Sequence, residues 1–222
     1  MASRCARQLG PRKSLVEKWN NPGVPRLPDH KFKVVRRSMT LKLQIGNVLD
    51  ASCDAILLTM DGAKKGLEGN IARAFSRRWP EAFAAIEDQV RYPVPLGMSV
   101  LAKRTADWEE DCPFSLVIMA SILHHIDVLD DRQKIRMIQS AFEDAIAIAR
   151  RFQMRSMATA VLTGGWRLSD QDALKAMLTV SSRQLPLLGS PDGYIFFTVE
   201  ENLKQAAQIA EDAGVAVGIA FE

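Results

Sequence analysis

Short apolar runs alternate with stretches of helical periodicity from residue 41 to the end of the chain. Short apolar runs bounded by turn residues are typical of buried strands, and apolar residues at three- and four-residue spacing are typical of helices packed by one face. The predicted strands are 41–45, 55–58, 99–103, 116–123, 157–162, 194–199 and 215–221. Three predicted helices begin after Gly69, at Glu81 and at Ser169, and two more span 131–152 and 200–213. Strands that alternate with helices predict an α/β sandwich with a largely parallel central sheet.

Three segments carry more specific expectations. The helix over 131–152 has the clearest pattern, since its apolar residues recur at helical spacing and two arginines stand near its end. Residues 41–45 alternate apolar and polar positions, which predicts an edge or half-buried strand. Residues 181–191 have the composition of a linker-like loop.

Two units of this chain share the order strand, glycine-containing loop, helix. In the first, residues 55–58 lead into the loop 61–66, and in the second, residues 157–162 lead into 163–167. Helix N-termini present free backbone N–H groups to anions, and ligands of parallel sheets bind outside the carboxyl ends of the strands. The two units therefore predict a cleft that holds a phosphate-bearing ligand from two sides. Ordinary turn chemistry remains the alternative, because only glycine reaches positive φ at little cost.

The order and spacing of these units resemble those of macrodomains. In that family a strand reading DAIVNAAN leads into GGGVDGAIHRA, and the corresponding segments here are DAILLTMD at 54–61 and KKGLEGNIARAF at 64–75. Residues 45–48 are similar to the family's Gly-Asp-Ile element, residues 163–167 to its diphosphate loop, and residues 95–100 to its Pro-Thr-Gly turn. The resemblance spans roughly residues 39–221 and implies a three-layer αβα sandwich with a mixed, mostly parallel sheet.

The resemblance also implies that the ligand is ADP-ribose or a related nucleotide diphosphate. Asn47 and Val48 fall where the family contacts adenine, and an Asn oxygen is able to accept that hydrogen bond. Asp61 falls where an Asn usually contacts the distal ribose. The other implied ligand contacts lie on two loops, with Gly66, Leu67 and Glu68 on the first and Thr163, Gly164, Gly165, Trp166 and Arg167 on the second. We expect no metal and no separate cofactor.

Departures from the family pattern bear on catalysis. Leu58 and Asp61 replace both asparagines of NAAN, and Lys64 and Lys65 replace two glycines of the first loop. A carboxylate repels a dianionic ligand unless a cation intervenes, and either lysine is a candidate for that cation. Removal of ADP-ribose from a substrate requires a base that activates water, and the candidates are Asp61 and Glu68. We therefore expect a macrodomain-like protein that binds ADP-ribose, with ADP-ribosyl hydrolase activity left open.

Two other functions fit the same residues. A degenerate macrodomain that has lost its ligand would act as a non-catalytic interaction or scaffold module. An RNA- or nucleotide-binding α/β protein would use the same phosphate cleft, with a strong dependence of binding on salt. His124 and His125 follow the predicted strand 116–123, but they lack metal-ligand spacing, so we expect a structural role for them.

Charge divides the chain near residue 37. Residues 1–37 contain ten Lys and Arg against two acidic residues, whereas the whole chain has a net charge of +3, so the remainder is mildly acidic. This predicts a basic, irregular N-terminal extension over 1–37 and an α/β domain over 38–222. Basic arms bind nucleic acid or other acidic partners, here including an ADP-ribosylated protein. A solvated extension without a partner explains the same composition.

Cysteine usage and hydropathy favour a location inside the cell. The three cysteines are odd in number and show no metal or redox spacing, which suits a reducing compartment. No apolar run approaches the roughly 18 residues needed to cross a bilayer, and the first twenty residues lack the hydrophobic segment of a secretory signal. We therefore expect a cytoplasmic protein.

Overall fold

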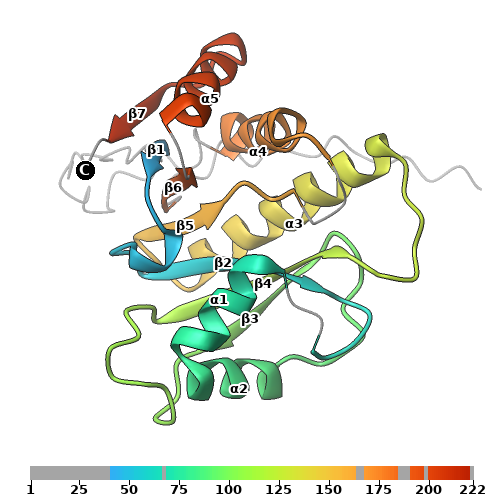
Figure 1. Cartoon of the computed structure of the whole chain (residues 1–222), viewed down its shortest axis with the longest axis vertical. Coiled ribbons are helices and arrows are strands. Elements are labelled where there is room, and N and C mark those ends of the chain that lie inside the picture. Colours follow the sequence, from blue (N-terminus) through green and yellow to red (C-terminus); the bar gives the residue numbers. More distant parts are fainter. Residues whose placement is uncertain (1–40, 67–68, 164–167, 185–190, 198–199, 221–222) are drawn as a thin grey trace, which may run out of the picture. The chain divides into compact units, whose positions relative to one another are not determined.

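The computed structural model describes residues 41–66, 69–163, 168–184, 191–197 and 200–220 (Figure 1). In chain order the elements are β1 (Leu41–Ile45), the 3-10 helix η2 (Val48–Asp50), β2 (Ala55–Asp61), α1 (Asn70–Arg78), α2 (Pro80–Gln89), β3 (Ser99–Lys103), β4 (Leu116–Leu123), α3 (Asp131–Arg151), β5 (Ser156–Ala160), α4 (Asp170–Gln184), β6 (Asp192–Phe197), α5 (Glu200–Asp212) and β7 (Val217–Ala220). The predicted alternation of strands and helices is confirmed.

These strands form one seven-stranded sheet in the order β3-β4-β2-β5-β6-β1-β7. The paired strands run parallel, except that β3 at the edge is antiparallel to β4. β2 is an interior strand, with β4 on one side and β5 on the other. The sheet is therefore mixed and mostly parallel, as predicted.

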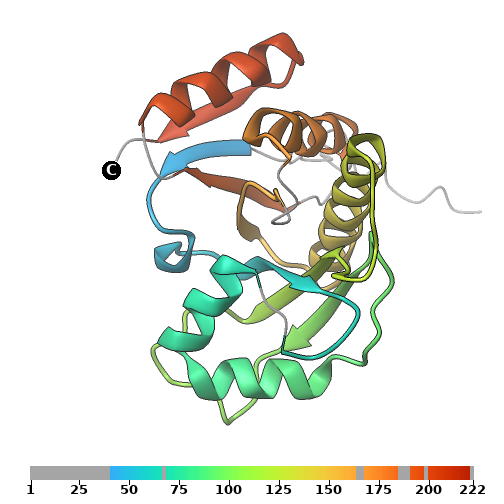
Figure 2. The same ribbon diagram turned by 45° about the vertical axis from the view of Figure 1, so that its right-hand side comes forward.

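Helices cover both faces of the sheet. α3, α4 and α5 share a core with one face, and α1 and α2 share a core with the other (Figures 1 and 2). In β2, Ala55 and Leu57 belong to the first core, whereas Ile56 and Leu58 belong to the second. A strand buried on both faces reads as a continuous apolar run, which is why this segment was recognisable in the sequence. The three-layer αβα prediction is confirmed.

The pairing of β2 with β4 shifts at the end of β2. Met60 pairs with Ser121, but Asp61 pairs with Leu123. An irregularity of this kind changes the direction in which a side chain points. It brings Asp61 next to the residues that follow β4.

An aromatic cluster holds α1 and α2 against the sheet. Trp79 lies between the two helices and is fully buried. Its ring centroid is 4.9 Å from that of Phe75 and 5.9 Å from that of Phe114, and both pairs have edge-to-face geometry. The indole Nε1 donates to Asp111 Oδ1 at 3.2 Å, so the polar end of this buried ring is satisfied.

Glu109, in the acidic loop between β3 and β4, caps α2 from a distance. Its two carboxylate oxygens accept hydrogen bonds from the backbone N–H groups of Glu81 and Ala82, each at 2.9 Å. Burial acts to raise the pKa of Glu109, but hydrogen bonds from its own backbone N–H and from those of Ala82 and Glu81 outweigh it and hold the pKa below its ordinary value. The loop thus satisfies N–H groups that the helix cannot pair within itself.

The structure corrects one sequence-based expectation and narrows another. α4 continues to Gln184, because Val180 and Ser181 are buried and packing extends the helix into the predicted loop 181–191. For β1 the structure shows the half-buried alternative of the prediction and not the edge strand, since β1 lies between β6 and β7. The polar residue Lys42 of β1 contacts β6, since its Nζ lies 5.0 Å from the ring centroid of Tyr194.

The predicted basic arm and its boundary at residues 37 and 38 lie outside the described residues. Among the helices that are described, none has the length and apolar character required to span a membrane.

Candidate functional site

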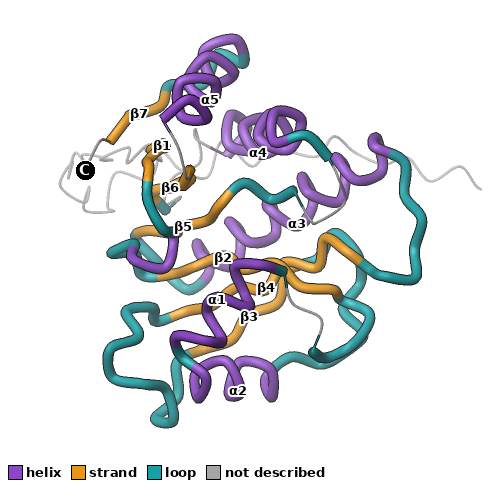
Figure 3. The backbone as a smooth tube through the Cα atoms, in the orientation of Figure 1, coloured by secondary structure: helices purple, strands orange, loops and turns teal. Residues whose placement is uncertain are grey.

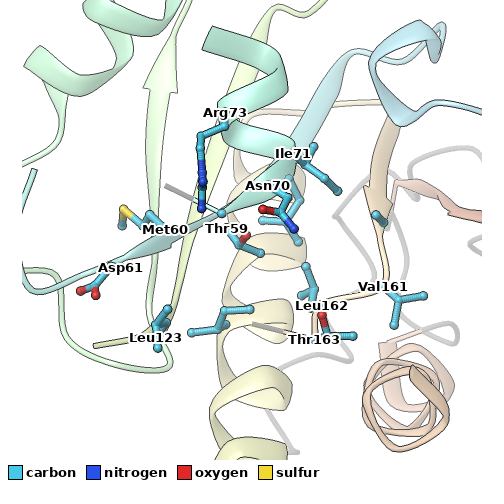
Figure 4. Close-up of a pocket in the computed structure, with 14 residues that line it drawn as sticks. Thr59, Met60, Asp61, Asn70, Ile71, Arg73, Leu123, Val161, Leu162 and Thr163 are labelled. Carbon is cyan, nitrogen blue, oxygen red and sulfur yellow. The ribbon is translucent and has the colours of Figure 1, made fainter. Parts of the chain in front are cut away.

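A pocket of about 290 Å³ opens at the carboxyl ends of three neighbouring strands, β4, β2 and β5 (Figure 4). Its wall comes from these strand ends and from the first turns of α1. The lining residues are Leu57, Thr59, Met60, Asp61, Gly69, Asn70, Ile71, Arg73, Ile122, Leu123, Ala160, Val161, Leu162 and Thr163. The pocket therefore lies where the two strand–loop–helix units of the sequence meet.

The topology explains why a pocket forms here. The chain leaves β2 toward α1 on one face of the sheet, and it leaves β5 toward α4 on the other face. Because the two connections diverge from adjacent strands, they leave a crevice between them. Such switch points are the usual ligand sites of open α/β sheets.

The first turn of α1 forms one wall of the pocket. Gly69 is its N-cap, with no side-chain cap, and the Gly69 N–H donates to the Thr59 carbonyl at 3.1 Å. A Cβ at this position would overlap Thr59 Oγ1, so the approach requires glycine. The first N–H groups of a helix lack intrahelical partners and carry partial positive charge, which favours anions. Asn70 and Arg73 extend from this wall toward β2 (Figure 4).

Asp61 lies at the end of β2, is 3% exposed and accepts three hydrogen bonds. Ala63 N–H donates to Oδ1 at 2.9 Å, while His125 N–H at 2.7 Å and His125 Nδ1 at 3.0 Å contact Oδ2. Because a carboxylate only accepts, Nδ1 carries the ring proton. The side chain that contacts Asp61 is thus the His125 imidazole, which donates through Nδ1–H.

Asp61→Asn is expected to lower the free energy of unfolding by about 1–3 kcal/mol. Both carboxylate oxygens accept from a backbone N–H, so an amide must turn its NH₂ toward Ala63 N–H or His125 N–H and leave that donor unpaired. Urea unfolding followed by fluorescence measures the change. His125→Ala is the matched control, since it removes the ring contact but keeps both backbone donors, and it should cost less. An Asp61→Asn protein as stable as the parent contradicts this account.

Gly62 joins the pocket to the loop between α2 and β3. Its N–H donates to the Leu123 carbonyl at 2.9 Å, and its own carbonyl accepts from Val94 N–H at 2.7 Å. The Val94 carbonyl in turn lies 2.8 Å from His124 Nε2 and accepts from Ser121 Oγ at 3.1 Å. Both histidines of the pair thus make contacts that hold this edge together, in line with the structural role expected of them.

The other sequence-predicted site residues are spread more widely. Thr163 lines the pocket together with Asp61. Asn47 is exposed and caps η2, its Oδ1 accepting from Leu49 N–H at 3.1 Å, while Val48 is buried in the core under α1 and α2. Neither is among the residues that line the pocket.

Gly66 is exposed, with a φ of +84° and its N–H 3.3 Å from Glu87 Oε1. The neighbouring Lys65 contacts Asp88 on α2, with 2.8 Å between Nζ and Oδ1. This face of the first loop therefore contacts α2. The predicted site residues Leu67, Glu68, Gly164, Gly165, Trp166 and Arg167 lie outside the described residues.

Sequence reasoning missed three polar pocket residues, Thr59, Asn70 and Arg73, and the partnership of Asp61 with His125. A signal for Asn70 and Arg73 was present, because they stand three residues apart on the side of α1 opposite the buried Ala72 and Phe75. The Asp61–His125 contact depends on the register shift at the end of β2, for which the sequence has no marker.

The described cysteines do not contribute to this site. Cys53 and Cys112 are buried and free. Burial raises the pKa of the Cys53 thiol to about 11 and also raises that of Cys112, so both stay protonated at neutral pH. No group of three or more His, Cys, Asp and Glu side chains within the described ranges is placed to hold a metal ion.

The arrangement is that of a doubly wound α/β protein with a pocket at its switch point. No family model matches the sequence, and no curated protein matches it. Solved structures do match. A variant of the Oceanobacillus iheyensis macrodomain with ADPR has a TM-score of 0.64 and 13% identity, over 80% of this chain and 95% of its own. The Mycobacterium tuberculosis DarG macrodomain has a TM-score of 0.56 and 23% identity, over 73% of this chain and 100% of its own.

A third neighbour is the Trypanosoma brucei macrodomain in complex with ADP, with a TM-score of 0.61 and 15% identity over 77% of this chain and 69% of its own. The chain therefore has the macrodomain fold, which confirms the resemblance seen in its sequence.

Proposed function

We propose that the pocket at the ends of β2, β4 and β5 binds ADP-ribose or a related nucleoside diphosphate. The observation that carries the proposal is the place of the pocket, at the switch point and against the first turn of α1. Anionic groups bind well at such a helix end. Two neighbours of the same fold are structures with ADPR and with ADP, which supports this class of ligand.

The contacts of Asp61 favour binding over hydrolysis. A general base needs an oxygen free to accept a proton from water. Both Asp61 oxygens already accept hydrogen bonds from Ala63 and His125, and the side chain is buried. We therefore propose Asp61 as a residue that shapes the pocket. Glu68, the other candidate base, lies outside the described residues, so a hydrolase assay follows once binding is measured.

Calorimetric titration with ADP-ribose, with AMP and NAD as comparison ligands, tests the proposal. We expect saturable binding of ADP-ribose with a Kd between about 1 µM and about 1 mM. The absence of detectable binding with all three ligands contradicts the proposal and favours a scaffold module that has lost its ligand.

Asn70→Glu is expected to weaken ADP-ribose binding by about tenfold or more, because it places a negative charge inside an anion pocket. An acidic residue in the first turn of a helix is stabilising, so the fold should be unharmed. Asn70→Gln is the control of equal size without charge and should bind within about threefold of the parent. Equal affinities of the two variants would show that the ligand's phosphates do not lie beside α1. Thermal unfolding of both proteins accompanies the titration.

A further inference from the structure

The charge within the pocket is concentrated on two side chains. Among the described lining residues, only Asp61 and Arg73 carry a formal charge. They come from different walls, Asp61 from the end of β2 and Arg73 from α1 (Figure 4). Asp61 accepts hydrogen bonds from three N–H donors and is buried. Arg73 is exposed.

Helix geometry directs Arg73 into the pocket. Its backbone N–H donates to the Gly69 carbonyl at 2.9 Å, so it stands one turn into α1. Side chains on a helix lean toward the N-terminus, and residues three apart share a face. The Arg73 side chain therefore reaches over the first turn beside Asn70, toward β2, as Figure 4 shows.

Two neighbouring cations lie outside the pocket lining. Lys65, a candidate from the sequence for the cation near the ligand, contacts Asp88 at 2.8 Å and Glu87 at 3.8 Å on α2. Arg78, farther along α1, pairs with Asp50, and its guanidinium lies 4.6 Å from the Trp79 ring centroid. Neither residue lines the pocket.

We propose that Arg73 is the phosphate-binding cation of this pocket and sets the orientation of the ligand. The inference deepens the proposed function and rests on it for the identity of the ligand. A guanidinium offers paired N–H donors that match two oxygens of a phosphate group. The Asp61 carboxylate disfavours phosphate at the other wall. The diphosphate thus lies against α1, on the side of the pocket away from Asp61.

Calorimetry of the full chain with ADP-ribose tests the assignment through three variants. Arg73→Gln should weaken binding by about tenfold or more, which is the expected loss of a charge-assisted contact. Arg73→Lys keeps the charge and should recover most of the affinity. Arg77→Gln removes the same charge one turn farther along the same helix, outside the pocket lining, and should leave affinity within about twofold.

The dependence on salt provides an independent readout. The loss caused by Arg73→Gln should shrink at high ionic strength, because screening weakens the contact in the parent protein. Parent-like affinity of Arg73→Gln overturns the assignment. An equal loss of affinity in Arg77→Gln also overturns it, since that result means that any positive charge on α1 favours the ligand to the same extent.

Inorganic pyrophosphate separates this inference from the proposed function. One outcome is that the parent protein binds pyrophosphate but not ADP-ribose, and that Arg73→Gln abolishes pyrophosphate binding. In that case the proposed ligand is wrong and the assignment of the phosphate site is supported. If the parent protein binds neither compound, both proposals fail.

Discussion

Trp79→Ala is expected to lower the free energy of unfolding by about 3–5 kcal/mol, the usual cost of removing a large buried aromatic side chain. The indole is fully buried between α1 and α2 and contacts the rings of Phe75 and Phe114. Truncation opens a cavity there and leaves Asp111 without its indole donor. A loss of this size is a large part of the 5–15 kcal/mol typical of a domain.

Chemical denaturation with circular dichroism measures this change, and Trp79→Phe is the control. Phenylalanine keeps an aromatic ring in the cluster but loses the hydrogen bond to Asp111 and part of the volume, so it should cost about 1–2 kcal/mol. If Trp79→Ala costs no more than Trp79→Phe, the cluster does not hold α1 and α2 as described.

Gly62→Ala is expected to destabilise the protein by about 3 kcal/mol and to abolish ligand binding. A methyl group at this position would overlap Ser121 Oγ and the Val94 carbonyl oxygen and lie 2.8 Å from His124 Nε2. The Gly62 backbone has no room to retreat, because hydrogen bonds to Leu123 and Val94 hold it from both sides. Movement of this segment displaces the adjacent Asp61.

Gly66→Ala provides the matched control in the same loop. Gly66 has a φ of +84°, but a Cβ there has no neighbour within 4 Å. Its cost should therefore be limited to backbone strain, about 1 kcal/mol. Urea unfolding compares the two variants, and ADP-ribose titration follows for each. Similar stability losses in both would mean that packing around Gly62 is looser than the contacts indicate.

Much of the fold was predictable because strands that are buried on both faces appear in the sequence as continuous apolar runs. β2 and β4 are continuous apolar runs, and α3 has apolar residues at regular helical spacing. The elements that departed from expectation were those governed by packing, such as the last turn of α4 around Val180 and Ser181. Sequence composition at that point favours a loop, and tertiary contacts decide otherwise.

The candidate site was less predictable because it is assembled from strand ends that are distant in sequence. Asp61 and Thr163 were recognised through the glycine loops that follow their strands, and both line the pocket. Their surroundings depend on the order of strands in the sheet and on one register shift, and a single sequence specifies neither. Arg73 lines the pocket only because the sheet order brings the ends of β4, β2 and β5 together beside α1.

The three hydrogen bonds to Asp61 join the end of β2, the turn after it and the second residue of the connection to α3 (residues 124–130, Figure 3). Three separate segments are thereby preorganised around one buried carboxylate before any ligand arrives. The conformational entropy of these segments is lost during folding, so ligand binding does not have to order them. Affinity at this wall then depends on the quality of each contact and not on the cost of ordering the protein around it.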